Sequence, residues 1–222
     1  MPAPRDQREP LNRERVLRAA VDLADERGLE RLSMRELGRT LGVEAMSLYN
    51  HVANKDDLLD GMVDLVIDEI DVPAADADWK AAMRRRAISA RAAFARHPWA
   101  VRLVDTRPSA GPARLRYFEA TIACLRRSGF APGLAVDTLS TLDGFVYGFG
   151  VHRLHVAEAD PPDDVAMAQA LASWLPAAEY PYLNELIVEH VLPGGYDEAA
   201  SFAFGLDLIL DGLEARLDEA EP

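Results

Sequence analysis

The segment from residue 33 to residue 55, SMRELGRTLGVEAMSLYNHVANK, constrains the fold of this chain more than any other part. Ser33 and Glu36 have the spacing of a capping box, which predicts a helix start, and Gly42 stands where a left-handed residue would end that helix. A second helix is predicted over residues 45–52, and Asn54 caps a further helix. Two short helices around a glycine turn are typical of a helix-turn-helix motif, which reads base edges in the major groove of DNA.

The apolar residues of this segment recur with helical spacing, so we expect them to form the core of a small head: Leu37, Leu41, Leu48 and Val52. The other residues of the second helix are left to face outward: Met46, Ser47, Tyr49, Asn50 and His51. An exposed face of this kind is suited to contact base edges and phosphates.

Apolar residues with helical spacing continue through the rest of the chain, without an alternating strand pattern or an internal repeat. Further helices are predicted over these approximate ranges: 12–27, 79–97, 112–128, 134–155, 161–175, 181–192 and 197–217. The predicted fold is all-α. A three-helix N-terminal head is joined by a fourth helix to a larger C-terminal helical bundle.

The segment VPAADAD at residues 72–78 interrupts the helical pattern and is the predicted domain boundary. We expect a flexible N-terminal arm over residues 1–11, a helix-turn-helix domain with its connecting helix over 12–72, and a larger helical domain over 78–222. The formal net charge is −13, but residues 1–60 hold 10 Lys and Arg against 12 Asp and Glu. The acidic excess therefore belongs to the larger domain, which favours a small contact face over non-specific coating of DNA.

No apolar run is long enough to cross a bilayer, and the N-terminus lacks the apolar stretch of a signal peptide, so the protein is expected to be cytoplasmic, without membrane association. The single cysteine, Cys124, is predicted to be a small buried hydrophobic residue.

Residues 14–62, ERVLRAAVDLADERGLERLSMRELGRTLGVEAMSLYNHVANKDDLLDGM, resemble the DNA-binding domain of TetR-family repressors. Three C-terminal segments resemble the regulatory domain of the tetracycline-repressor branch: TRP at 106–108, GF at 129–130 and FGLDLILDGLEARL at 204–217. The resemblance implies a repressor that binds a palindromic double-stranded DNA operator as a homodimer and is released by a small-molecule inducer. It makes residues 78–222 the ligand-binding and dimerisation domain, with the helices at 134–155 and 197–217 expected to form a four-helix bundle with their symmetry mates.

The resemblance also implies the residues that contact DNA. They are Arg35 in the first helix of the motif, Ala45, Met46, Ser47, Tyr49 and His51 in the recognition segment, and Lys55 at the start of the fourth helix. A hydroxyl such as that of Ser47 can bond a base or a phosphate, and the ammonium of Lys55 can bind a phosphate beside free backbone N–H groups.

In the tetracycline-repressor pattern a histidine before the Thr-Arg-Pro segment binds the magnesium ion of the drug, and Leu103 occupies that position here. We therefore expect no metal, no cofactor and an inducer other than tetracycline. The candidate ligand-binding residues are Arg86, Ala90, Phe94, Leu103, Thr106, Phe118, Phe145, Phe149 and His152. Arg86 and His152 can donate to an anion, so the predicted inducer is an organic molecule with an acidic or strongly polar group.

Three alternatives are open at this point. The protein could be a DNA-binding activator, an architectural protein without an inducer, or a helical enzyme. The architectural reading leaves two-thirds of the chain without a role. The enzyme reading lacks a nucleophile elbow, a phosphate loop or a dinucleotide fingerprint, and among the histidines only His152 and His155 are closely spaced. We therefore predict that the protein is not an enzyme.

Overall fold

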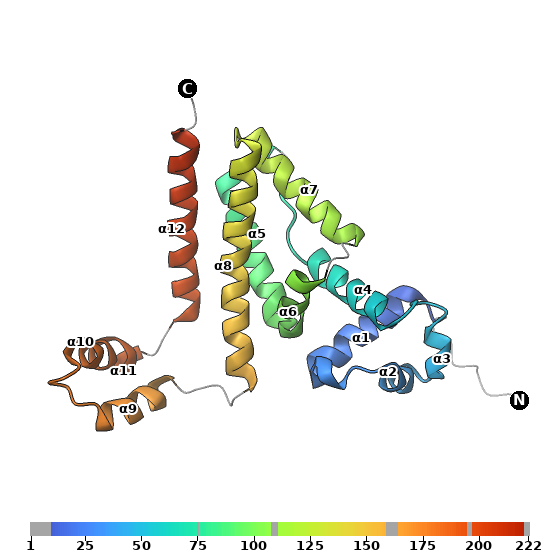
Figure 1. The fold of residues 1–222 in the computed structure, drawn as a ribbon, viewed down its shortest axis with the longest axis horizontal. Coiled ribbons are helices and arrows are strands. Elements are labelled where there is room, and N and C mark those ends of the chain that lie inside the picture. Colours follow the sequence, from blue (N-terminus) through green and yellow to red (C-terminus); the bar gives the residue numbers. More distant parts are fainter. Residues whose placement is uncertain (1–9, 75, 108–110, 159–163, 195–196, 220–222) are drawn as a thin grey trace, which may run out of the picture. The chain divides into compact units, whose positions relative to one another are not determined.

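A computed structural model of the chain describes residues 10–74, 76–107, 111–158, 164–194 and 197–219, with the backbone alone described at 105, 151–158, 164 and 194 (Figure 1). These residues form helices and turns without any strand, which confirms the all-α prediction. The chain divides into two compact units, residues 1–139 and 140–222, which are described separately. The domain boundary expected at residues 72–78 lies within the first unit and stays a prediction.

The first unit contains α1 (Arg13–Arg27), a 3-10 turn η1 (Leu29–Arg31), α2 (Met34–Leu41), α3 (Ala45–Leu48), α4 (Lys55–Asp68), α5 (Trp79–Arg96), α6 (Pro98–Thr106), α7 (Pro112–Arg127) and the start of α8 (Pro132–Glu158). The side chains of Asn12, Asn54 and Asp78 each accept a hydrogen bond of 2.8 Å from the backbone N–H three residues later. These caps fix the starts of α1, α4 and α5.

Helix α6 was not predicted. Pro98 was interpreted only as the stop of the preceding helix, but it also stands at the first position of α6. Proline is suited to that position because its fixed φ is helical and its missing N–H would have no partner there. Pro98 therefore ends one helix and begins the next.

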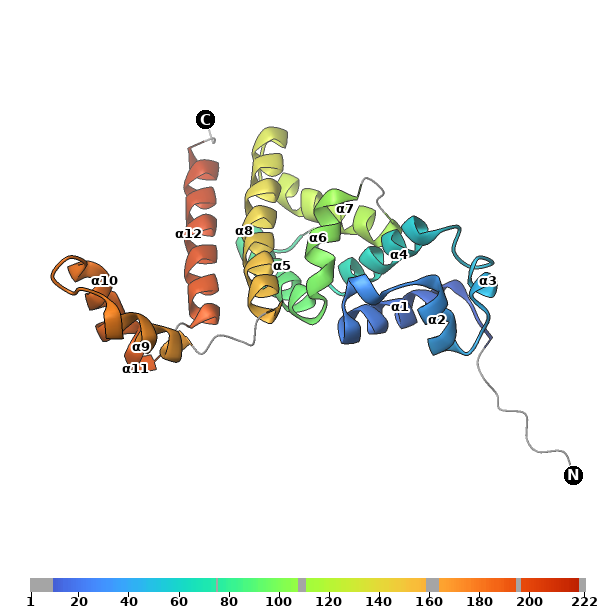
Figure 2. The same cartoon turned by 60° about the horizontal axis from the view of Figure 1, so that its bottom comes forward.

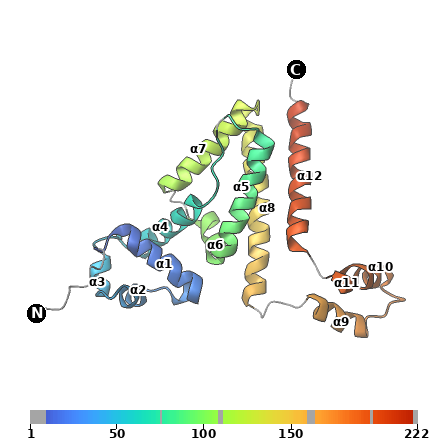
Figure 3. The same cartoon turned by 180° about the vertical axis from the view of Figure 1, so that it is seen from behind.

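Helix α4 lies at the centre of the first unit and contacts α1, α5, α6 and α7 (Figures 1 and 2). Leu58, Met62 and Val66 are fully buried along its apolar face. A Cβ added to Gly61 would lie 2.6 Å from the Leu17 Cδ2 atom of α1, so the two helices approach closely at this residue. Seen from behind, α5 and α6 lie together, and α4 connects them with the head formed by α1, α2 and α3 (Figure 3).

A second face of α4 carries four aspartates spaced by four residues: Asp56, Asp60, Asp64 and Asp68. The first two bind the guanidinium of Arg107, which caps the C-terminus of α6. The third accepts hydrogen bonds from the backbone N–H groups of Ala113 and Arg114, at 3.1 and 2.9 Å, and so caps α7. The fourth pairs with Arg116 at 2.8 Å. One polar face of α4 therefore holds the end of α6 and the beginning of α7.

The corner between α5 and α6 is fixed to the head through a buried histidine. The His97 ring lies between two carboxylates: Nδ1 is 2.9 Å from Asp25 of α1, and Nε2 is 3.2 Å from Glu69, which follows α4. The indole N–H of Trp99 donates to Asp25 at 2.6 Å. These bonds join α1, α4 and α6 at one point.

The second unit contains the rest of α8, α9 (Asp164–Trp174), α10 (Pro181–Glu185), a π-helical segment (Leu186–Val191), α11 (Leu192–Gly194) and α12 (Glu198–Asp218). The single helix expected over 181–192 is thus interrupted by a π-helical stretch. Phe145 and Phe149 of α8 pack with Phe202 of α12, with ring centroids 5.0 to 5.1 Å apart. A Cβ on Gly205 would lie 2.7 Å from the Phe145 ring, so the absence of a side chain at Gly205 leaves room for this ring.

Among the described residues, no helix is both long enough and apolar enough to span a bilayer.

Candidate nucleic-acid interface

Helix α2 begins at a serine cap, as its sequence predicts. The Ser33 Oγ atom accepts a hydrogen bond from the Glu36 N–H at 3.2 Å. The other half of the predicted capping box is replaced, because the Glu36 carboxylate binds two arginines instead. Its Oε1 atom lies 2.6 Å from Arg27 Nη1 and also accepts a hydrogen bond from Arg39. The hydrogen bond from Arg39 and the charges of both arginines hold the pKa of Glu36 below its usual value.

The turn after α2 is closed by glycine geometry. Gly42 has a φ of 69°, in the left-handed region, and its N–H bonds the Arg39 carbonyl at 3.2 Å. The Val43 N–H bonds the Gly38 carbonyl at 2.9 Å, which completes a Schellman motif. A Cβ on Gly38 would lie 2.9 Å from the Val43 carbonyl oxygen and 3.2 Å from the Ala45 Cα atom. Helices α2 and α3 therefore meet at a contact that leaves no room for a side chain.

The recognition helix is shorter than predicted. Regular α-helix covers Ala45–Leu48 instead of residues 45–52, and the chain continues as a turn in which the N–H groups of residues 49–51 each bond the carbonyl three residues earlier. Hydrogen bonds that span three residues give a narrower turn than those of an α-helix, which span four. The chain then reaches Asn54, which caps α4. Leu48 and Val52 are buried as predicted, so the inward face of the segment is unchanged.

The residues expected to contact DNA all lie at accessible positions of the head. Met46 and Tyr49 are 75% and 44% exposed. Arg35 and Lys55 are also exposed, while Ala45, Ser47 and His51 are half-buried. Six of these seven residues come from α2, α3 and the turn after it, and Lys55 begins α4.

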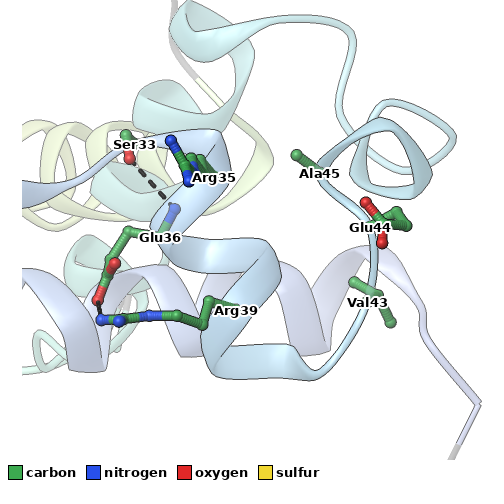
Figure 4. A pocket seen from close by; sticks show the side chains of 7 residues that line it. All are labelled: Ser33, Arg35, Glu36, Arg39, Val43, Glu44 and Ala45. Atoms are coloured by element: carbon green, nitrogen blue, oxygen red, sulfur yellow. Dashed lines mark hydrogen bonds and ion pairs between the residues drawn. The ribbon is translucent and has the colours of Figure 1, made fainter.

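A hollow of about 570 Å³ lies between α2 and the start of α3 (Figure 4). It is lined by Ser33, Arg35, Glu36, Arg39, Val43, Glu44 and Ala45. In Figure 4 Arg35 and Ala45 stand on opposite sides of this hollow, so the α2 arginine and the first residue of α3 can approach one bound group.

The sequence analysis missed Arg13, which holds the recognition segment in place from α1. Its Nη1 atom donates to the His51 carbonyl at 3.0 Å, and its two terminal nitrogens bond the Asp57 carboxylate at 2.8 and 2.6 Å. Asp57 also accepts a hydrogen bond from the Ala53 N–H at 2.8 Å. The hydrogen bond from Arg13 lowers the pKa of Asp57, and the same bond raises the pKa of Arg13. Sequence spacing gives no signal for this contact, because 44 residues separate the partners.

The α5 candidates for ligand binding share one buried face of that helix. Arg86, Ala90 and Phe94 follow one another at four-residue intervals, and each is at most 3% exposed. The Arg86 guanidinium lies 4.6 Å from the centroid of the Tyr117 ring of α7, a cation–π geometry.

The remaining candidates have other surroundings. Leu103 and Phe118 are half-buried, and Thr106 is exposed with its hydroxyl donating to the Arg102 carbonyl at 2.8 Å. Phe145 and Phe149 belong to the aromatic cluster of the second unit. The side chain of His152 lies outside the described residues. Arg86, Ala90 and Phe94 thus share one face of α5, and Phe145 and Phe149 share the aromatic cluster of the second unit. A pocket that joins all the candidates stays a prediction.

Two family models match the chain. Residues 16–62 match the model described as "Bacterial regulatory proteins, tetR family", and residues 72–217 match "Tetracyclin repressor-like, C-terminal domain". The HTH-type transcriptional repressor DrrR1 of Streptomyces coeruleorubidus is 35% identical over 92% of this chain and 77% of its own length. The class A tetracycline repressor from transposon 1721 of Escherichia coli is 32% identical over 90% of this chain and 89% of its own length.

The chain is also similar in structure to solved proteins of this family. Apo ActR of Streptomyces coelicolor matches with a TM-score of 0.79 and 30% identity, covering 96% of this chain and 99% of that one. ActR in complex with actinorhodin matches with a TM-score of 0.77 at the same identity, covering 94% of this chain and 99% of that one. With its capped helix-turn-helix head, its all-helical second part and matches over almost its whole length, the chain belongs to the TetR family of helix-turn-helix transcriptional repressors.

Proposed function

We propose that this regulator binds a palindromic operator as a homodimer and that an organic ligand, bound by its helical regulatory part without a metal, releases it. The proposed DNA binding is supported by the contacts that fix the helices of the head. The Gly38 contact sets α3 against α2, and Arg13 holds the end of the recognition segment at His51. Because the reading surface is already ordered before DNA binds, less conformational entropy is lost on binding. This favours sequence-specific contacts in a chain whose net charge of −13 gives little non-specific attraction to DNA.

Individual contacts follow from the exposed positions of the head. Tyr49 and Lys55 are expected to bind operator phosphates, Arg35 and Ser47 to reach base edges, and Met46 to meet an apolar base surface. The two aspartates that follow Lys55 are each paired with an arginine, Asp56 with Arg107 and Asp57 with Arg13. Their repulsion of a phosphate at the start of α4 is thereby reduced.

The test is binding of an operator duplex from the promoter of the gene itself or of its neighbours, located by footprinting. Tyr49→Ala and Lys55→Ala should each weaken binding by about tenfold or more, corresponding to about 1.4 kcal/mol. Tyr182→Ala is the matched control, because this tyrosine is 84% exposed and lies in the other compact unit. The stoichiometry of the complex should be two chains for each palindrome. Parent-like binding by both head variants would refute the assigned face.

For dimerisation, the proposed surface includes α12. Its Phe204 and Leu208 are 67% and 60% exposed and lie one turn apart, while Phe202 and Leu206 face inward. Burial of two large apolar side chains from each of two copies is favourable by the usual hydrophobic term. Phe204→Glu combined with Leu208→Glu should give a monomer in light scattering, with helical content preserved. A variant that remains dimeric contradicts the α12 surface.

For the ligand, the proposal starts from Arg86. Its guanidinium is buried beside the Tyr117 ring, on the same face of α5 as the apolar side chains of Ala90 and Phe94. This combination suits an aromatic molecule with an acidic group. The solved relative ActR was crystallised with actinorhodin, which supports an organic ligand at the family level.

Aromatic acids and their methyl esters should be screened for release of operator DNA, with and without a chelator. We expect an acid to release DNA, its ester to act at least tenfold more weakly, and chelation to have no effect. Arg86→Met should remove the preference for the acid, while Arg85→Met, at the exposed neighbouring position, should keep it. Release that requires a metal, or an acid preference that survives in a folded Arg86→Met variant, would refute this ligand class.

A further inference from the structure

A group of arginines next to the proposed base-reading surface has no role in the contacts assigned above. Four arginines and two glutamates fall between residues 27 and 39, in a chain whose net charge is −13. Arg35 is already assigned to base contact. We refer to the other three, Arg27, Arg31 and Arg39, as the flanking arginines.

The flanking arginines surround one carboxylate. Arg27 comes from the last turn of α1, Arg31 ends η1, and Arg39 lies on α2. Arg27 and Arg39 both bind the Oε1 atom of Glu36, whose side chain is only 23% exposed. The Glu36 carboxylate therefore faces two guanidinium groups at close range, and the three flanking arginines outnumber the two glutamates of this segment.

The flanking arginines also border a hollow. A space of about 480 Å³ is lined by Arg27, Arg31, Ser33, Glu36 and Arg39. Ser33, Glu36 and Arg39 also line the hollow that holds Arg35 and Ala45 (Figure 4). Because they share these three lining residues, the two spaces are adjacent on the head.

The side chains of this group are accessible to a large partner. Those of Arg27 and Arg39 are 47% and 72% exposed, and Arg31 is exposed. Guanidinium groups bind phosphate through paired N–H donors and hold it more firmly than a point charge does. Glu36 restrains two of the three guanidinium groups, which reduces the entropy lost when a phosphate binds.

We infer that Arg31 and Arg39, with Arg27 held beside them by Glu36, bind a backbone phosphate of the operator that flanks the base pairs reached by Arg35. This inference rests on the proposed operator binding and extends it to a second contact region of the head. Its role differs from that of Arg35, because phosphate contacts add affinity for any duplex and carry no base information. It also explains how an acidic protein can gain enough attraction to hold DNA, through local charge at the interface.

The test is the salt dependence of duplex binding by the full-length dimer. Kd is measured by fluorescence anisotropy on the operator and on a scrambled duplex of equal length, between about 50 and 200 mM salt. The slope of log K against log salt is negative, and Arg31→Gln and Arg39→Gln should each reduce its magnitude by about 0.9 per half-site, and so by about 1.8 for the dimer. Each variant should also lose affinity by a similar factor on both duplexes.

Two variants separate this role from simpler ones. Arg35→Gln should lose affinity mainly on the operator, which distinguishes base reading from phosphate binding. Arg85→Gln makes the same charge change at an exposed position of α5, and it should leave the slope unchanged. Thermal melting shows whether the head remains folded, and Arg39→Lys should recover part of the slope if charge at this position is what matters.

Several results would overturn the inference. Unchanged slopes in folded Arg31→Gln and Arg39→Gln, with the parent binding its operator, would remove the flanking site and leave the proposed function standing. Losses confined to the operator would make these residues base readers instead. If inorganic phosphate competes with DNA for the parent but not for Arg39→Gln, the phosphate site is supported. If phosphate binds but the Arg31→Gln and Arg39→Gln substitutions do not change DNA affinity, the residues form a site for the free ion instead. A parent that binds neither duplex would overturn the proposed function together with this extension.

Discussion

Replacing Gly38 with alanine tests how the head sets the angle between α2 and α3. The new Cβ would lie 2.9 Å from the Val43 carbonyl oxygen and 3.2 Å from both the Cα and the N of Ala45. All three are backbone atoms, so a rotamer change cannot relieve the contact. The α2–α3 junction must open by roughly 0.5 Å to restore an ordinary separation.

Two effects of this substitution oppose each other. Overpacking typically costs about 1 to 3 kcal/mol, whereas replacing glycine by alanine inside a helix gains about 1 kcal/mol. We therefore expect the free energy of unfolding to fall by only about 0 to 2 kcal/mol. Operator affinity should suffer more than stability, because the opening displaces the whole recognition segment and each good base contact is worth about 1 to 3 kcal/mol. A loss of at least tenfold in operator affinity is expected.

The assay combines urea denaturation with operator binding by anisotropy. Gly133→Ala is the control, since a Cβ at this α8 position meets nothing within 4 Å. It should leave the affinity unchanged and keep or slightly raise the stability. If Gly38→Ala stabilises the protein by about 1 kcal/mol and binds operator like the parent, then the contact relaxes freely and the argument that Gly38 sets the reading angle is refuted.

Two further predictions concern ion pairs of α4. The pKa of Asp57 is lowered by Arg13, so the stability from this pair is present above the unfolded-state pKa of about 3.9 and is lost as pH falls through the lower folded-state value. The difference in melting temperature between the parent and Arg13→Met should therefore be largest at neutral pH, begin to shrink at about pH 4 and fall further as the pH passes the lowered pKa of Asp57; a constant difference would contradict this origin. Arg107→Gln removes a guanidinium that is only 15% exposed and bound to Asp60, and should cost about 1.5 to 3 kcal/mol in urea denaturation. Arg116→Gln, from a pair that is 64% and 60% exposed, should cost less than about 1 kcal/mol, and equal losses would show that burial does not decide the strength of these pairs.

The sequence by itself determined the local features of the head. The caps at Ser33 and Asn54, the left-handed residue at Gly42 and the buried positions of Leu48 and Val52 are all confirmed. Each depends on residues a few positions apart, so spacing and side-chain chemistry are sufficient to predict it. The resemblance of residues 14–62 to the TetR family was confirmed by the matching family models for the same reason: the motif is contiguous in the chain.

Where local signals were ambiguous, the tertiary structure decided. Pro98 ends one helix and begins α6, and the sequence pattern showed only the first of these roles. The predicted helix over 181–192 is interrupted at Leu186–Val191, and the recognition helix ends at Leu48. The exact ends of helices depend on the path that the chain must follow to its next packed element, and local propensity does not encode that path.

Contacts between distant residues were decided by the tertiary structure alone. Arg13 binds Asp57 across 44 positions, and His97 joins Asp25, 72 positions earlier, to Glu69. Likewise, only the tertiary structure brings Arg27 of α1 to the Glu36 oxygen that Arg39 also binds. A charged side chain in a sequence has many possible partners, and only the packing of helices determines which of them lies within hydrogen-bond distance.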